Sequence, residues 1–113
     1  MAARKKRVSK PKSVKVGVQD IDIVYSGEYS DAIVTYEPMV QGKLVPELKV
    51  IHVYEHNNED MTKNTILHET MHAIDQFMNT GLSEEQILQL TNGLILVGRN
   101  NKDFFKYIFC MEE

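Results

Sequence analysis

Residues 61–78 read MTKNTILHETMHAIDQFM, and this stretch decides the fold around it and the chemistry that the chain can offer. In a helix with a turn of about 100° per residue, His68, His72 and Asp75 fall on one face. The larger apolar side chains occupy the roughly opposite arc, namely Ile66, Leu67, Ile74, Phe77 and Met78. The pattern predicts a helix from about Met61 to Met78, with an apolar side for the core and a polar side that carries the histidines.

The polar side of this helix contains His68-Glu69-Thr70-Met71-His72, an H-E-x-x-H pattern. Two imidazoles four residues apart on a helix can bind one metal ion, and the glutamate between them can reach a metal-bound water. Such a water is activated because the metal lowers its pKa, and the glutamate accepts its proton. We therefore predict a zinc site with His68 and His72 as ligands and Glu69 as the general base.

A catalytic zinc ion usually has three protein ligands, so a third must come from elsewhere. Ser83-Glu84-Glu85-Gln86 predicts a capping box, with Ser83 as the N-cap of a second helix. Glu84 and Glu85 are the acidic candidates, although their alternative role is to interact favourably with the helix dipole. Asp75 is a further candidate, better suited to orient an imidazole N–H than to bind the metal.

Four segments before the metal-bearing helix are predicted strands. They are rich in β-branched and aromatic residues and comprise Val14–Val18, Ile21–Tyr25, Ala32–Tyr36 and Glu47–Tyr54. Gln41-Gly42-Lys43 and Pro46 mark turns between them. The last strand is expected to form a sheet edge beside the helix, to which an extended peptide could add.

Gly81 is predicted to end the H-E-x-x-H helix by taking a left-handed backbone conformation. A second helix is then expected to run to about Val97, with an apolar stripe of Ile87, Leu90, Leu94 and Val97, and a short one from Asp103 to about Cys110. The fold class is therefore α+β: a small, mainly antiparallel sheet packed on a metal-bearing helix that one or two further helices follow.

The chain has 113 residues, 42% of them hydrophobic, and a net charge of −3, which fits one modest domain. Seven of its 13 basic residues lie in residues 1–15, where there is no acidic residue. We predict a disordered basic arm over residues 1–13, with contact to nucleic acid or a membrane surface as the alternative, and one domain over residues 14–113. The single Cys110 excludes an internal disulfide and is expected to pack in an apolar run. No membrane span or secretory signal is expected, which favours the cytoplasm.

Other polar residues have weaker assignments. His52 and His56 are expected on the surface, at the end of the last strand. Tyr36, Tyr54 and Asn79 are candidate donors to the oxyanion of a hydrolytic reaction, and the sequence does not choose among them.

Residues 65–75, TILHETMHAID, resemble the active helix of small zincin-type proteins of phages and prophages, which are similar to the ImmA/IrrE metallopeptidases. The segments Gly81–Ile87 and Leu90–Leu94 are also similar to that group. The resemblance covers about residues 47–100. It implies a gluzincin-like site in which a glutamate of the second helix is the third ligand, and by position this is Glu85 rather than Glu84. It also implies a protein substrate.

The sequence thus predicts a zinc-dependent metallopeptidase that hydrolyses peptide bonds. The first alternative is a catalytically silent protein of zincin fold that holds metal and sequesters a protein or nucleic-acid partner. The second is a nucleic-acid-associated regulator that uses the basic arm and a structural metal.

Overall fold

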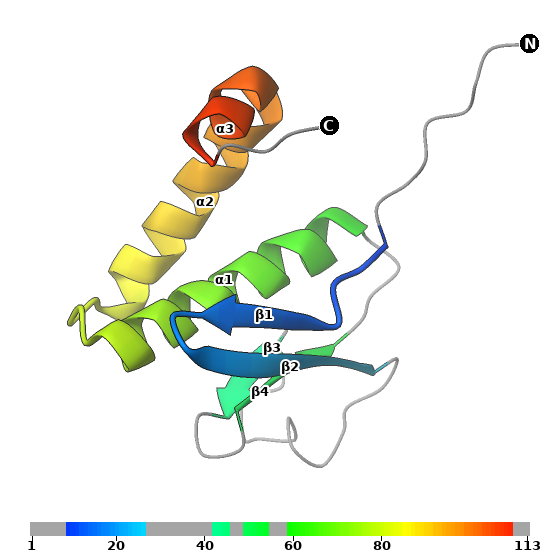
Figure 1. Cartoon of the computed structure of the whole chain (residues 1–113), viewed down its shortest axis with the longest axis vertical. Coiled ribbons are helices and arrows are strands. Elements are labelled where there is room, and N and C mark those ends of the chain that lie inside the picture. The colour runs from blue at the N-terminus through cyan, green and yellow to red at the C-terminus, as the bar shows by residue number, and fades with distance from the viewer. Residues whose placement is uncertain (1–8, 27–41, 46–48, 55–58, 110–113) are drawn as a thin grey trace, which may run out of the picture.

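The computed structural model describes residues 9–26, 42–45, 49–54 and 59–109. These residues form four strands and three helices (Figure 1). The strands are β1 (Ser13–Val16), β2 (Gln19–Ser26), β3 (Gly42–Val45) and β4 (Val50–Tyr54). The helices are α1 (Glu59–Met78), α2 (Glu84–Asn100) and α3 (Lys102–Ile108). The predicted α+β class is confirmed.

The strands form one mixed sheet in the order β1-β2-β4-β3. The β1–β2 and β3–β4 pairs are antiparallel, whereas β2 and β4 run parallel. The sheet is therefore mainly antiparallel, as predicted. The strand expected to form an edge, β4, instead lies between β2 and β3. The edge beside α1 is β3, in a segment that the sequence pattern assigned to a turn.

The core lies between α1 and one face of the sheet. Alternate residues of a strand point to the same face, and the aliphatic residues of β2 and β4 that face α1 are fully or almost fully buried. With Ala73 of α1 they make up most of the core, whose buried members are Val16, Ile21, Ile23, Ile51, Val53 and Ala73. Ile66, Ile74 and Phe77 of α1 pack against this cluster. The apolar side predicted for the helix is thus largely the side that meets the sheet, although Met78 is exposed.

The beginning of the described chain packs on β2. Lys12 O accepts a hydrogen bond from Ile23 N at 2.9 Å, and Tyr25 Oη donates to Pro11 O at 2.6 Å. The Lys10 ammonium lies 4.9 Å from the centre of the Tyr25 ring. Residues 10–13 of the predicted arm are therefore in contact with β2. Residues 1–8 lie outside the described residues, and the domain boundary at residue 14 stays a prediction.

Several element boundaries differ from the prediction. β1 ends at Val16, because Gly17 takes a φ of 61° and turns the chain into β2. α1 begins two residues earlier than expected, and α2 continues through Gly98 to Asn100. The strand candidate Ala32–Tyr36, together with Tyr36, His56 and Cys110, lies outside the described residues.

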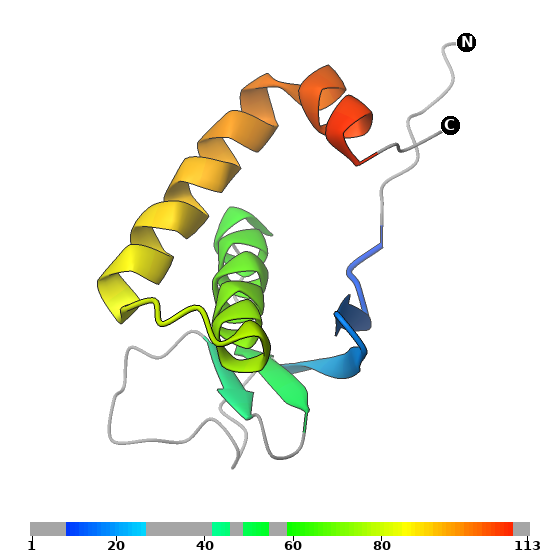
Figure 2. The same cartoon turned by 60° about the vertical axis from the view of Figure 1, so that its left-hand side comes forward.

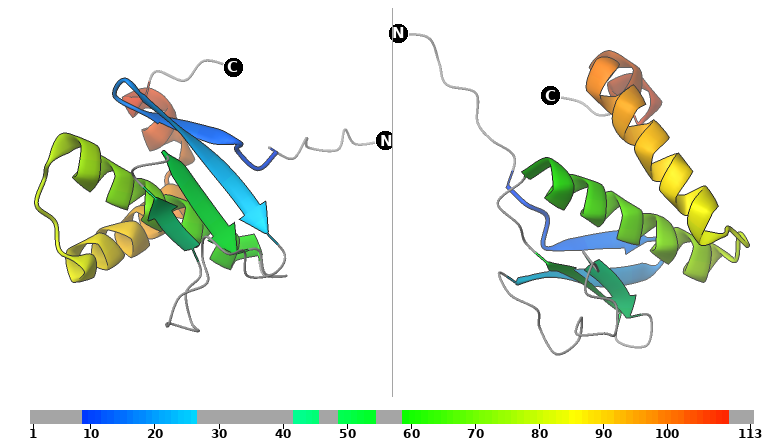
Figure 3. Two further views of the ribbon diagram at one scale, coloured as in Figure 1. Left: turned by 90° about the horizontal axis from the view of Figure 1, so that it is seen from below. Right: turned by 180° about the vertical axis from the view of Figure 1, so that it is seen from behind.

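The helix α2 lies on the side of α1 away from the sheet and diverges from it (Figures 1 and 3). Near the connection the two helices touch, and Ile87 and Thr91 are buried. Farther along, the predicted apolar stripe is exposed: Leu90, Leu94 and Val97 show 46%, 38% and 42% of their surface. Of the predicted stripe only Ile87 is buried. α3 follows at the end of α2 that lies far from the sheet (Figure 2).

Candidate metal centre

The histidines of the H-E-x-x-H pattern lie on α1 and face the start of α2. Their ring centroids are 4.9 Å apart, and both side chains are partly buried. The nearest ligand atoms of His68, Glu69 and His72 all lie within 4.8 Å of one another, which is close enough for one metal ion. The structure thus gives this part of α1 the geometry of a metal-binding group.

The carboxylate of Glu84 bridges the two imidazoles. His68 Nε2 lies 2.8 Å from Glu84 Oε1, and His72 Nε2 lies 2.7 Å from Glu84 Oε2. Glu84 is the first residue of α2, and its side chain is 66% exposed. Each oxygen of one carboxylate therefore addresses one histidine, and the nitrogen atoms that would bind a metal point toward this carboxylate.

The structure brings Glu84 to the histidines, the position that the resemblance assigned to Glu85. Glu85 is exposed and belongs to the same first turn of α2. Adjacent residues of a helix point about 100° apart, so only one of the two can face α1. The sequence pattern left both open because the choice depends on the path of residues 79–83.

Glu69 points from the other side of the motif toward the sheet edge. Its side chain is buried, with 7% of the residue exposed, and its Oε1 accepts a hydrogen bond from the backbone N–H of Leu44 in β3 at 2.9 Å. Burial raises the pKa of the Glu69 carboxyl, whereas His72, His68 and the Leu44 N–H oppose that rise and Glu84 adds to it. A carboxylate with this environment is a stronger base than an exposed one, as a general base requires.

The strand β3 approaches α1 closely because it begins with a glycine. A Cβ on Gly42 would lie 2.6 Å from Thr65 Cγ2 and 2.9 Å from His52 O. The sequence pattern predicts only a turn at Gly42, because a glycine after Gln41 is typical of one. The role of the Leu44 amide could not be predicted, since every residue except proline has the same main-chain donor.

Asp75 lies in the last turn of α1 and is hydrogen-bonded to the chain reversal that follows the helix. Its Oδ1 accepts hydrogen bonds from Thr80 Oγ1 at 2.6 Å and Leu82 N at 2.8 Å. These bonds lower the pKa of the Asp75 carboxyl, the Thr80 hydroxyl first and the Leu82 amide next. The sequence had predicted a hydrogen bond from Asp75 to an imidazole, and the structure shows that it binds this turn.

The other candidate donors lie away from the motif. His52 and Tyr54 alternate with the buried Ile51 and Val53, so their side chains leave the opposite face of β4. Burial lowers the pKa of the His52 imidazole. Asn79 is exposed in the turn after α1, with a φ of 55°.

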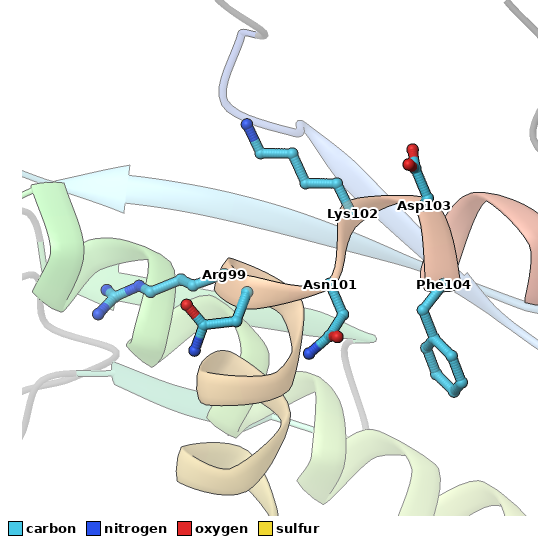
Figure 4. Close-up of a pocket in the computed structure, with 6 residues that line it drawn as sticks. Arg99, Asn101, Lys102, Asp103 and Phe104 are labelled. Carbon is cyan, nitrogen blue, oxygen red and sulfur yellow. The ribbon is translucent and has the colours of Figure 1, made fainter.

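Two pockets lie elsewhere in the described chain. One is at the junction of α2 and α3, where the side chains of Arg99, Lys102 and Phe104 point in different directions rather than toward one point (Figure 4). The other lies between the first half of α1 and the second half of α2. Neither includes a residue of the H-E-x-x-H motif.

Among the described residues, no helix combines the length and the apolar character that a membrane crossing requires. The chain matches no family model, no curated protein and no solved structure.

Proposed function

We propose that this protein is a zinc-dependent peptidase in which His68, His72 and Glu84 bind the metal and Glu69 is the general base. The observation that carries the proposal is the contact of one carboxylate with both imidazoles of the motif. Two imidazole nitrogens and a carboxylate are a ligand set of catalytic zinc, and they leave a fourth position open. The donor set therefore fits zinc in number and in kind.

A bound zinc ion would supply a Lewis acid that polarises a peptide carbonyl and lowers the pKa of a water. Glu69 would take the proton of the attacking water and return it to the leaving amine. The Leu44 N–H holds one carboxylate oxygen, so the carboxylate is fixed in orientation. Its raised pKa makes the carboxylate a stronger base and so favours the first step, in which Glu69 takes up the proton.

The substrate in this proposal is an extended peptide. β3 is the edge of the sheet that lies beside Glu69, and an edge strand offers main-chain groups to which such a peptide can pair. The family resemblance to phage and prophage metallopeptidases also implies a protein substrate. The cytoplasmic location, the phage origin and the role of the basic arm stay predictions.

A second candidate is the silent binding protein, which holds metal without cleaving. It is favoured by the apolar side chains that α2 and α3 expose, since a partner could cover them. The largest exposed fractions in this region belong to Tyr107, to Phe109 directly after α3, and to Leu96.

The two candidates differ at Glu69. We expect the purified protein to contain one zinc ion and to cleave members of a mixture of synthetic peptides, with products identified by mass spectrometry. Glu69→Gln should retain zinc and lose cleavage by a factor of about 10² to 10⁴, because it removes the base and no ligand. Glu85→Gln is the matched control and should keep both properties.

Two results would contradict the proposal. A protein without zinc after supplementation would remove its basis. A zinc-loaded wild-type protein that cleaves no peptide of the mixture would favour the binding protein instead.

A further inference from the structure

The connection from α1 to α2 is built as a tight reversal of the chain. Asn79 and Gly81 both take left-handed backbone conformations, with φ of 55° and 77°. Between and after them, the Thr80 hydroxyl and the Leu82 amide donate to the single oxygen Oδ1 of Asp75. One carboxylate in α1 therefore holds two points of the turn.

The far end of the turn is fixed by the cap of α2. Ser83 Oγ accepts from Gln86 N at 3.1 Å, and Gln86 Oε1 accepts from Ser83 N at 2.8 Å. Glu84 is the next residue after this cap. The backbone is thus held from Asp75 through Leu82 to Ser83, and the following residue is the one that reaches the histidines.

Packing against neighbouring side chains does little to position Glu84. Its side chain is 66% exposed, so packing does not decide where its carboxylate lies. Its position must come from the backbone that carries it. A shift of the turn would move the carboxylate away from two nitrogen atoms that it meets at 2.7 and 2.8 Å.

We propose that Asp75 is a positioning residue of the metal centre, which acts through Glu84 by fixing the turn between the helices. This inference rests on the proposed function for its zinc ligands. It differs from the contact expected from the sequence, in which Asp75 would orient an imidazole. It also explains why a residue with no metal-ligand geometry of its own lies one turn beyond the motif.

A double-mutant cycle on zinc affinity tests the inference, with affinities measured by competition against a chromophoric chelator. Asp75→Ala should weaken zinc binding by about tenfold or more, the range for residues that support metal ligands. In a Glu84→Ala background the same change should alter the affinity by less than about twofold, because the ligand that Asp75 positions is gone. Asp75→Asn keeps the accepting oxygen Oδ1 and should restore most of the wild-type affinity.

The matched control breaks a contact between the same two helices at their other end. Asp60 lies 3.4 Å from Arg99, and Asp60→Asn should leave zinc affinity unchanged. Equal losses from Asp75→Ala in both backgrounds would overturn the inference, since the residue would then act on the fold or on the histidines. No loss in the wild-type background would overturn it as well.

A second measurement needs no metal. In the metal-free protein, Asp75→Ala should move the NMR signals of the His68 and His72 rings in the same direction as Glu84→Ala does, and Asp60→Asn should not. If the wild type binds no zinc but the rings respond in this way, the proposed function fails and the positioning role stands. If the rings do not respond, the positioning role fails whatever the zinc result.

Discussion

Glu69 is the residue whose environment is most unusual, because a carboxylate is buried between two histidines and a strand. Its pKa is raised by burial, which means that its ionised form is less favourable in the folded chain than in the unfolded chain. The stability linked to this group is therefore fully present below its ordinary value of 4.5 and is lost as pH rises through the raised folded value. At neutral pH the group therefore costs stability.

Replacing Glu69 with glutamine removes this cost and retains an oxygen that can accept from the Leu44 N–H. We expect Glu69→Gln to raise the Tm of the metal-free protein at about pH 7, and the gain to shrink as pH falls toward about 5. The gain shrinks because Glu69 takes up a proton as pH falls, and its neutral form does not carry the cost of a buried charge. Circular dichroism melts across this range would measure the gain. The control is the exposed Glu85→Gln, with little change at any pH. A Tm gain that does not depend on pH would contradict this account.

At the scale of elements, the contact of β3 with α1 depends on Gly42. An added Cβ would meet the Thr65 methyl and the His52 carbonyl at under 3.0 Å, and the backbone carbonyl cannot move aside without disturbing β4. We expect Gly42→Ala to lower the free energy of unfolding by about 1–3 kcal/mol, as overpacking does. Urea denaturation would show it as a lower midpoint. Gly93→Ala in α2 is the control. A Cβ added there has no neighbouring atom within 4 Å, and the change should raise the free energy of unfolding by about 0.5–1 kcal/mol. Equal effects at the two glycines would show that β3 is not packed against α1 as described.

The elements also show where sequence patterns suffice. The apolar periodicity of α1 and the Ser83–Gln86 capping box depend on residues close in sequence, and both are present in the structure. β3 could not be predicted, since Gly42 and Lys43 favour a turn and only pairing with β4 makes them a strand. Helix periodicity likewise could not predict which of Glu84 and Glu85 contacts the histidines. The path of the turn before α2 decides this, and Asp75 is hydrogen-bonded to that turn. The predicted apolar stripe of α2 is present in the sequence, but how much of it is covered could not be predicted, because no periodicity specifies the angle at which two helices cross.

On the scale of the whole molecule, the first half of α2 contains its buried residues, and the second half is mostly exposed. Ile87 and Thr91 are buried at the end near the connection. Farther on, the links to α1 are polar and exposed: Asn64 Nδ2 donates to Asn92 Oδ1 at 3.2 Å, and Arg99 lies 3.4 Å from Asp60. α3 has no buried residue, and two of its neighbouring rings, Phe105 and Phe109, stack on each other at 5.8 Å rather than on the sheet.

Hydrogen exchange should therefore divide the helices into two groups. Amides of α1 and of residues 87–91 should exchange only through global unfolding. Those of residues 95–108 should exchange through local opening and lose protection orders of magnitude sooner, because few apolar contacts hold them. Zinc should increase protection in α1 and in the first turn of α2, since its ligands lie in those two places, and should leave residues 95–108 unchanged. Exchange followed by mass spectrometry, with and without zinc, measures both effects. Uniform protection along α2 would contradict this prediction. It would mean that the exposed apolar side of α2 is covered in solution by a second copy of the chain or by another partner.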